Sequence, residues 1–278
     1  MRIVRFEHRG IIGVGALIES CVAPIAASDV LSARGMPVSD DRIALSEVKL
    51  LSPIKRPGKI LGIGVNYAAH AAESVSFINT SEPSVQKWFN KQATSINDPF
   101  GDVHLPKVSE QLDYEAELVV VIGQRGRHVP ASRAMELVAG FCCGCDYSVR
   151  DWQKASQTMI MGKGFDTHAP IGPALVTPDE VRDLAGVEVR SFVNGEQRQT
   201  GHVRDMVHDI PAQIAHLTAA FTLEPGDLIF TGTPAGVGAG HKPPKWLKAG
   251  DVVRVELEGI GSFENRIVIE PGDLVIGS

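Results

Sequence analysis

The sequence contains no long apolar run, few cysteines and no excess of positive charge. None of its apolar stretches reaches the ~20 residues that a membrane-spanning helix needs. The first residues, Met1–His8, are charged and strand-like, and they lack the apolar core of a secretory signal. We therefore expect a cytoplasmic protein with no membrane partner.

Positive charge is in deficit along the chain. The formal net charge is −6 at pH 7, whereas a protein whose main partner is a nucleic acid normally carries a basic surface. The sequence also shows no internal repeat, heptad run or low-complexity segment. We therefore expect no nucleic-acid partner.

The four cysteines are Cys21, Cys142, Cys143 and Cys145. The run from Cys142 to Cys145 lacks the spaced second pair of a zinc ribbon, and adjacent cysteines rarely ligate one ion. We interpret these residues as small apolar side chains in a packed strand.

Length and composition indicate one large domain with a small appendage. With 278 residues and 44% hydrophobic content the chain can bury a substantial core. Pro57-Gly58 is a turn signal, so we place a small N-terminal region at 1–56 and the main domain at 57–278.

The order of apolar and turn-forming residues predicts mostly strands. Strands are expected at 1–20 (a pair turning at Arg9-Gly10), 59–64, 115–122, 139–147, 187–194, 227–231, 251–257 and 262–268. Helices are expected at 67–74, 131–138, 148–156, 178–184 and 210–219. Residues 75–100 are polar and predict an irregular loop or lid. Because strands and helices do not alternate regularly, we predict an α+β fold with a mixed, mostly antiparallel, rolled or barrel-like sheet.

Two acidic residues stand at the start of a buried strand. Glu115 and Glu117 precede the β-branched run 118–122, and their spacing puts both side chains on one face of a strand. Two neighbouring carboxylates that lose hydration repel each other, and a bound cation relieves that repulsion. The alternative is an exposed strand end with solvated acids.

Asp146 ends the next apolar run and offers a third carboxylate. Three carboxylates without histidine or cysteine select a hard divalent ion, Mg²⁺ or Mn²⁺. The alternative role of Asp146 is a cap for the following helix.

His70 and Glu73 are three residues apart in a predicted helix and so lie on one face. A carboxylate on one ring nitrogen leaves the other nitrogen as a general base. The alternative is a chance pairing on a solvent-facing surface.

Two glycine-rich segments are further candidates. Gly162-Lys163-Gly164 permits close backbone approach and places an ammonium near an anion. The loop 231–238, Thr-Gly-Thr-Pro-Ala-Gly-Val-Gly, has amides and hydroxyls suited to cradle a carboxylate, or it is simply a structural turn.

Taken together, these motifs resemble the fumarylacetoacetate hydrolase family. The matching segments, in the family's order, begin at Gly64 (GVNYAAHAAE), Asp113 (DYEAEL), Asp146 (DYSVRDWQ), Gly162 (GKGFD), Asn194 (NGE), Pro225 (PGDLI) and Thr231 (TGTPAGVG). Cys145 stands where many members have Asn, which is expected to alter the surroundings of the metal. The segment 73–91 is also longer and more polar than in many members.

The resemblance implies roles for particular residues. Glu115, Glu117 and Asp146 would hold Mg²⁺ or Mn²⁺, in agreement with the interpretation of the carboxylates above. His70, oriented by Glu73, would activate a water, and Lys163 would stabilise a developing oxyanion. Arg150, Gln153 and Thr233 would contact a small 2-oxo or diketo acid substrate. A homodimer is also implied.

The expected activity is that of a metal-dependent hydrolase that cleaves a carbon–carbon bond in a 1,3-dicarbonyl substrate, such as an acylpyruvate or 2,4-diketo acid. The alternative is an oxaloacetate-type decarboxylase, isomerase or tautomerase on the same metal site, because one scaffold hosts several reactions. A third possibility, a non-catalytic metal-dependent binding protein, would leave the dyad and Lys163 without a task.

Overall fold

The computed structural model describes residues 1–78 and 85–272. Strands predominate and helices are few and short, so the predicted α+β class is confirmed. The sheets are open and do not close into a barrel. Within the described residues, no helix is both long and apolar enough to span a membrane.

Twelve strands of the described chain form the larger sheet, which is mixed and mostly antiparallel. Its order is β4-β3-β2-β1-β14-β12-β11-β17-β6-β7, with β5 on β1 and β8 on β14. The bounds are β1 Arg2–His8, β2 Ile11–Ile18, β3 Cys21–Ile25, β4 Ile43–Ala44, β5 Lys49–Leu51, β6 Ile60–Gly64, β7 Lys87–Lys91, β8 Ile96–Asn97, β11 Ala116–Ile122, β12 Val138–Cys145, β14 Ala169–Val176 and β17 Leu228–Phe230.

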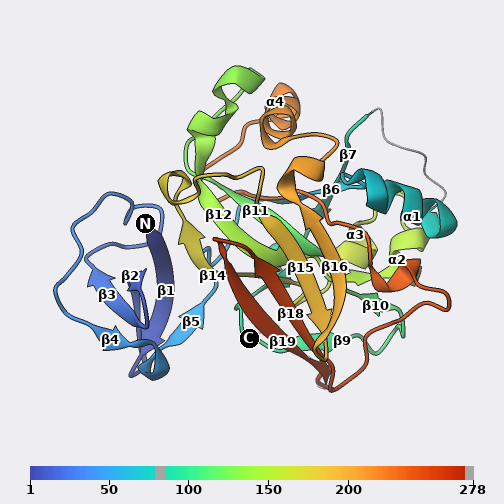
Figure 1. The fold of residues 1–278 in the computed structure, drawn as a ribbon, viewed down its shortest axis with the longest axis horizontal. Coiled ribbons are helices and arrows are strands. Elements are labelled where there is room, and N and C mark those ends of the chain that lie inside the picture. The colour runs from blue at the N-terminus through green and yellow to red at the C-terminus, as the bar shows by residue number, and fades with distance from the viewer. Residues whose placement is uncertain (79–84, 273–278) are drawn as a thin grey trace.

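The N-terminal strands extend this sheet at one end of the molecule (Figure 1). β1 and β2 form the predicted hairpin, whose turn residues Arg9 and Gly10 have φ of 52° and 79°. β1 also pairs with β14 through Arg2 and Ile3, so backbone hydrogen bonds join the N-terminal region to the main body. The division near residue 56 stays a prediction.

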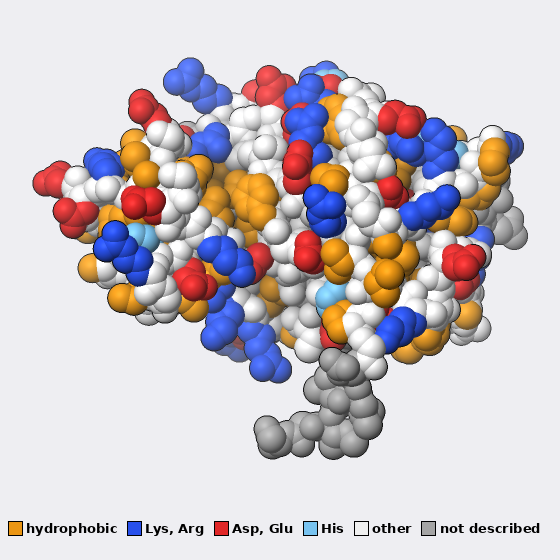
Figure 2. Space-filling model, turned by 90° about the horizontal axis from the view of Figure 1, so that it is seen from below, with side chains coloured by type: hydrophobic (Ala, Val, Ile, Leu, Met, Phe, Trp, Pro, Cys, Tyr) orange, Lys and Arg blue, Asp and Glu red, His pale blue; other side chains and the backbone are white. Residues whose placement is uncertain are grey.

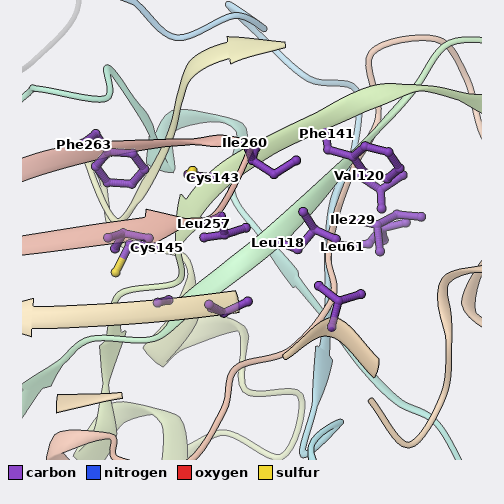
Figure 3. Packing of buried hydrophobic residues seen from close by; sticks show 14 of the residues in the cluster. Leu61, Leu118, Val120, Phe141, Cys143, Cys145, Ile229, Leu257, Ile260 and Phe263 are labelled. Atoms are coloured by element: carbon purple, nitrogen blue, oxygen red, sulfur yellow. The ribbon is translucent and has the colours of Figure 1, made fainter. Parts of the chain in front are cut away.

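A five-stranded sheet of the described residues packs on the larger one. Its order is β16-β15-β18-β19-β9, with bounds β9 Val103–Leu105, β15 Glu188–Val193, β16 Glu196–His202, β18 Val252–Leu257 and β19 Gly261–Ile269. A separate small pair consists of β10 Leu112–Asp113 and β13 Ser148–Val149. The main core fills the space between the sheets, where Leu118 and Phe141 lie near Leu257 and Ile260 (Figure 3).

β11 is buried on both faces, as its β-branched composition predicts. Leu118 and Val120 belong to the main core, whereas Val119 and Val121 pack into a second core with residues of the N-terminal strands such as Ile3. The alternation follows from the two-residue period of a strand. The strand is therefore anchored on both sides, and the acidic residues at its start are held by a rigid element.

The cysteines of β12 are apolar core residues, as the sequence analysis interprets them. Cys143 and Cys145 lie among side chains that include Leu257, Ile260 and Phe263 (Figure 3). Burial raises the pKa of the Cys143 thiol to about 12, which keeps the thiol neutral and unreactive.

The helices are α1 Ala68–Ile78, α2 Arg150–Ala155, α3 Ile160–Lys163 and α4 Ile210–Ala220, and 131–137 is a 3₁₀ segment. α4 begins as predicted, because Asp209 accepts a hydrogen bond from the amide of Ala212 and a proline occupies the first turn. The predicted helix 178–184 is wrong. Only a 3₁₀ turn forms in this segment, at Pro178–Glu180. A second turn follows it, in which the carboxylate of Asp183 accepts a hydrogen bond from the amide of Gly186.

The prediction of an irregular segment at 75–100 is also wrong in part. α1 continues to Ile78, and β7 follows as an edge strand paired with β6. Residues 79–84 of the predicted lid lie outside the described part of the chain. β7 matters for the site because it carries Phe89 and Lys91 inward, both of which are buried.

The surface shown in Figure 2 carries acidic and basic side chains side by side, with apolar side chains between them. This mixture differs from the continuous basic stripe that is typical of nucleic-acid-binding surfaces.

Candidate active site

A cavity of about 480 Å³ lies where β6, β7, β11, α2 and α3 meet. In Figure 1 the helices α1, α2 and α3 gather beside β7, at the end of the molecule remote from the N-terminal strands. Most of the residues predicted for the site line this cavity, namely His70, Glu115, Glu117, Arg150, Gln153, Lys163 and Thr233. The other two, Glu73 and Asp146, contact lining residues directly.

The three predicted metal ligands converge. Glu115, Glu117 and Asp146 are buried and offer carboxylate oxygens that lie within 4.8 Å of one another. The antiparallel register explains the convergence, because Ala116 pairs with Cys145 and the amide of Asp146 donates to the carbonyl of Glu115 at 2.8 Å.

The cluster fits a hard divalent cation. Burial raises the pKa of Glu117 well above its ordinary range, and the neighbouring carboxylates of Asp146 and Glu115 raise it further. Glu117 therefore lacks sufficient compensating positive charge from the protein itself. An oxygen-only donor set with this deficit suits Mg²⁺ or Mn²⁺ better than Zn²⁺.

Lys163 lies among these carboxylates. Its ammonium donates to Glu115 and, at 2.5 Å, to Oδ2 of Asp146, and it also lies 4.5 Å from the ring centroid of Phe89. Burial alone would lower the pKa of Lys163, but the carboxylates of Asp146 and Glu115 raise it. Lys163 is therefore a charged donor within the cavity.

Lys91 is a further buried residue of the site and was not among the residues predicted from the sequence. Its fully buried ammonium donates to Oδ1 of Asp146 at 2.6 Å and to the carbonyl of Tyr147 at 3.1 Å. Burial lowers the pKa of Lys91, partly opposed by Asp146. The signal was the alternation in Lys-Trp-Phe-Asn-Lys, which marks a strand with Phe89 and Lys91 on one face.

The buried guanidinium of Arg150 donates hydrogen bonds to two carboxylates and to Gln153. Its Nε donates to Asp113 and its Nη2 to Glu115, both at 2.8 Å, and Nη1 donates to Oε1 of Gln153 at 2.9 Å. Arg150 lowers the pKa of Glu115 against the effect of burial. Substrate contacts by Arg150 and Gln153 stay predictions, since the structure shows both side chains engaged with protein groups.

Asp113 was not among the site residues predicted from the sequence. It is fully buried and accepts from Arg150 and from the amides of Gly238 and Ala239, at 2.6 Å and 3.0 Å. These donors come from residues far along the chain, which local sequence does not reveal. Asp113 fixes Arg150 from behind and so positions Glu115.

The predicted dyad forms on α1. Nδ1 of His70 lies 3.2 Å from Oε2 of Glu73, and Nε2 lies 3.4 Å from the hydroxyl of Ser74. Glu73 also accepts from the amide of Gly236 at 3.2 Å. The dyad is therefore tied to the loop that follows β17.

The backbone amides of the loop after β17 donate hydrogen bonds to carboxylates. These carboxylates are side chains of the protein itself, not groups of a ligand. Gly232 donates to Glu117 at 2.7 Å, Gly236 to Glu73, and Gly238 with Ala239 to Asp113. One loop thus orients a predicted metal ligand, the partner of the histidine and the anchor of the arginine.

Thr233, a predicted substrate contact, holds this loop on β11. Its hydroxyl donates to the carbonyl of Ala116 at 2.8 Å and accepts from Nε2 of Gln199 at 2.7 Å. Gln199 in turn accepts from the amide of Ala116 at 3.0 Å. The substrate role of Thr233 stays a prediction.

Comparison with known proteins places these features in a family. A family model described as fumarylacetoacetate (FAA) hydrolase C-terminal matches residues 59–268. A second model, described as Rv2993c-like, N-terminal, matches residues 1–53. The chain therefore belongs to the fumarylacetoacetate hydrolase family of enzymes, as its motifs predict.

Individual relatives carry different activities in their names. Human oxaloacetate tautomerase FAHD2A, a mitochondrial protein, is 44% identical over 225 residues, which are 80% of this chain and 70% of that protein. The solved fumarylacetoacetate hydrolase of Exiguobacterium antarcticum has a TM-score of 0.86 at 35% identity and covers 97% of this chain and 100% of its own. A 2-hydroxyhepta-2,4-diene-1,7-dioate isomerase from Mycobacterium marinum has a TM-score of 0.83 at 31% identity, with 98% and 100% covered.

Proposed function

We propose that the protein is a Mg²⁺- or Mn²⁺-dependent enzyme that interconverts the keto and enol forms of a 2-oxo acid of the oxaloacetate type. The observation that carries the proposal is the convergence of a buried three-carboxylate cluster and a His–Glu dyad on one cavity. The 44% identity with an oxaloacetate tautomerase favours this reaction over the hydrolysis that the sequence analysis put first.

In this proposal, metal binding, proton transfer and stabilisation of the oxygen fall to different residues. Glu115, Glu117 and Asp146 would hold the divalent ion, which would polarise the 2-oxo group and acidify the protons on the adjacent carbon. His70, kept in orientation by Glu73, removes one of those protons and returns it to the oxygen, so it acts first as base and then as acid. Lys163 donates to the oxygen that gains charge.

Carbon–carbon hydrolysis of an acylpyruvate is the second candidate. The His70–Glu73 pair favours it, because a histidine held by a carboxylate is equally suited to deprotonate a water. The water would attack the remote carbonyl, and the bond between that carbonyl and the adjacent carbon would break. Decarboxylation of oxaloacetate needs no such water and would not depend on this base.

The experiment compares three reactions of the purified protein, each with Mg²⁺ and with a chelator. Enol–keto interconversion of oxaloacetate is followed by ultraviolet absorbance, pyruvate release from oxaloacetate by a coupled assay, and acetylpyruvate cleavage by loss of its own absorbance. We expect metal-dependent acceleration of the first reaction. Rapid cleavage of acetylpyruvate with interconversion at the uncatalysed rate would establish the hydrolase instead. Metal-dependent stabilisation with no turnover in any assay would indicate a binding protein.

The homodimer and the cytoplasmic location remain proposals that rest on family resemblance and composition. Sedimentation of the purified protein tests the first, and fractionation of cells tests the second.

A further inference from the structure

The protein has a second cavity, of about 730 Å³, outside the site described above. Its wall is formed by the end of β9, the hairpin of β15 and β16, and the segment 244–251 that leads into β18. None of the described residues that line it also lines the active-site cavity. A cavity of this size can hold a small organic molecule, and the proposed reaction makes no use of it.

Part of the wall of the second cavity is apolar and includes an aromatic side chain. Leu105, Val193, Trp246 and Leu247 line it. Val193 and Leu247 are buried, whereas Trp246 is only partly buried. A half-buried indole offers a flat apolar surface on which an aromatic ring can stack. This part of the wall therefore favours a ligand with a flat, apolar body.

Arg198 supplies a mostly buried positive charge to the same cavity. Its side chain is 12% exposed, and its Nη2 lies 3.0 Å from Oε2 of Glu196. Its Nε is buried and has no hydrogen-bond partner among the described residues. Nε and Nη2 form the edge of a guanidinium that binds a carboxylate through two parallel hydrogen bonds. Glu196 therefore occupies only half of that edge.

Glu196 is a partner that a ligand can replace. Its side chain is 56% exposed, and its other oxygen lies 3.1 Å from Nζ of Lys245. Exposed ion pairs of this kind contribute less than about 1 kcal/mol, so the carboxylate of Glu196 can turn into solvent with little loss of stability. The edge of Arg198 is then open to a carboxylate of a ligand, with the ammonium of Lys245 beside it.

The acidic side chains that line the second cavity do not oppose such a ligand strongly. Asp251 accepts from the side chain of Asn194 and from the amide of Lys248, both at 2.8 Å. Glu110 is exposed to solvent. The side chain of Lys248 also lines the cavity and adds a further positive charge. The lining as a whole therefore favours an anion.

Tyr114 connects the second cavity with the active site. It lies in the wall of the second cavity, and its two neighbours in the chain, Asp113 and Glu115, both accept hydrogen bonds from Arg150. One short segment therefore contacts the second cavity through Tyr114 and the active-site arginine through the residues on either side.

The loop after β17 makes two further connections. The hydroxyl of Tyr114 donates to the carbonyl of Gly236 at 3.0 Å, and the amide of Gly236 donates to Glu73 of the dyad. The amide of Lys245 donates to the carbonyl of Gly238 at 2.9 Å, a residue whose own amide donates to the carboxylate that anchors the arginine. A ligand that restrains Tyr114 and Lys245 therefore also restrains the active-site groups.

We propose that the second cavity is an effector site for a small aromatic carboxylic acid, whose ring packs on Trp246 and whose carboxylate takes the place of Glu196 on Nε and Nη2 of Arg198. The bound acid restrains Tyr114 and the loop after β17, and so strengthens binding of the divalent ion by the carboxylate cluster. The effect on the ion rests on the proposed metal site. Binding of the acid itself does not depend on the proposed function.

Calorimetric titration with 2-naphthoate tests the binding site, and 2-naphthamide serves as the uncharged analogue. We expect the wild-type protein to bind naphthoate at least about tenfold more tightly than naphthamide. Arg198→Gln should raise the dissociation constant of naphthoate by roughly 10- to 100-fold, the usual effect of losing a charge-assisted hydrogen bond. Equal affinity of the wild type for the two probes would overturn the proposed site.

Glu196→Gln changes the affinity in the other direction and so separates a specific effect from damage to the fold. Because it removes the competing charge, it should tighten binding of naphthoate by roughly two- to fivefold, whereas a disturbed fold would weaken it. The matched control is Lys154→Gln, at an exposed lysine of the active-site cavity, which should leave the affinity unchanged. Unchanged or weaker binding by Glu196→Gln, or a loss of affinity in Lys154→Gln, would refute the site.

Reciprocal titrations test the effector role. Saturating naphthoate should lower the dissociation constant of Mg²⁺ about fivefold or more, and saturating Mg²⁺ should lower that of naphthoate by the same factor. Tyr114→Phe should still bind naphthoate but lose this factor. A Mg²⁺ affinity that naphthoate leaves unchanged would contradict the effector role. If Mg²⁺ does not bind at all, the proposed metal site fails and the effector role falls with it, whereas the naphthoate titrations still decide whether the second cavity binds the acid.

Discussion

Lys91 Nζ lies 2.6 Å from Oδ1 of Asp146, and both side chains are completely buried. The other oxygen of the same carboxylate accepts from Lys163. Lys91 lies behind the carboxylate and does not line the cavity. It therefore fixes the direction in which Asp146 presents its second oxygen to Glu115 and Glu117.

Replacing Lys91 by methionine should cost about 3–5 kcal/mol of unfolding free energy, because it leaves a buried carboxylate with one partner fewer. Urea unfolding in a chelator measures the change. Lys49→Met is the control, since Lys49 is 67% exposed and 3.6 Å from Asp98, and such a pair contributes less than about 1 kcal/mol. Equal losses in the two variants would contradict a structural role for Lys91.

Glu117→Gln should have opposite effects with and without metal. Without metal the variant should be more stable than the wild type near neutral pH, because burial and the adjacent carboxylates disfavour the charged form of Glu117. Saturating Mg²⁺ or Mn²⁺ should stabilise the wild type, by about 2.7 kcal/mol at a hundredfold excess over Kd, and the variant far less. Thermal unfolding measures both effects. Glu136→Gln, at an exposed ion pair, should respond to metal like the wild type.

His70→Ala should lower kcat for keto–enol interconversion by roughly 10²- to 10⁴-fold, the usual contribution of a general acid–base. Thermal stabilisation by Mg²⁺ should persist, because His70 is not one of the three carboxylate residues predicted to hold the ion. Glu73→Gln should give a smaller loss, since the amide keeps a hydrogen bond but not the charge. A His70→Ala enzyme with wild-type kcat would remove His70 from the mechanism.

Gly240→Ala tests whether the loop after β17 keeps Glu73 in contact with His70. A Cβ at this position would lie 2.0 Å from Oε1 of Glu73, so the carboxylate must move and release His70. We expect a lower kcat with metal stabilisation retained. If the substitution acts through Glu73, adding it to Glu73→Ala should cause little further loss. Fully additive losses would mean that Gly240 acts by another route.

Because of His168, the free energy of unfolding should decrease at acidic pH. It is buried against Phe165, and its Nε2 lies 2.8 Å from the carbonyl of His104. Burial lowers its pKa from 6.5 to about 3. The unfolded chain therefore binds a proton that the folded one does not, and stability falls as the pH drops from 6.5 to 3, by up to about 1.4 kcal/mol per pH unit.

Urea unfolding across this pH range measures the slope. His168→Asn should have a shallower slope than the wild type, even if it is less stable at neutral pH. His216→Asn, at an exposed position of α4, should keep the wild-type slope. Identical slopes in all three proteins would assign the acid sensitivity to other groups.

Local patterns were sufficient to predict the elements that carry the three predicted metal ligands. The β-branched run after Glu117 identified β11, and the apolar run before Asp146 identified β12, because each strand is buried on both faces. Their antiparallel register then brings the three carboxylates together, which neither segment shows alone. His70 and Glu73 were predictable because helical spacing is a local property.

The missed residues depend on distant partners. Asp113 accepts hydrogen bonds from Gly238 and Ala239. The alternation around Lys91 indicates a strand, but it does not reveal that the partner of Lys91 is Asp146, 55 residues later. Pro178-Asp179-Glu180 has the composition of a helix start, but no apolar periodicity follows it to sustain a helix. For Asp113 and Lys91 the deciding interaction lies outside the window that a pattern covers.

The loop after β17 has a consequence for the order of events during synthesis. Glu117 is oriented by Gly232, a residue 115 positions later. A nascent chain that has emerged only as far as α3 contains Glu115, Glu117 and Asp146. It does not yet contain the amide of Gly232, which orients the carboxylate of Glu117. If the cluster holds a divalent ion as proposed, tight capture of that ion would be a late event, and metal affinity would report whether the C-terminal third of the chain has reached its native place.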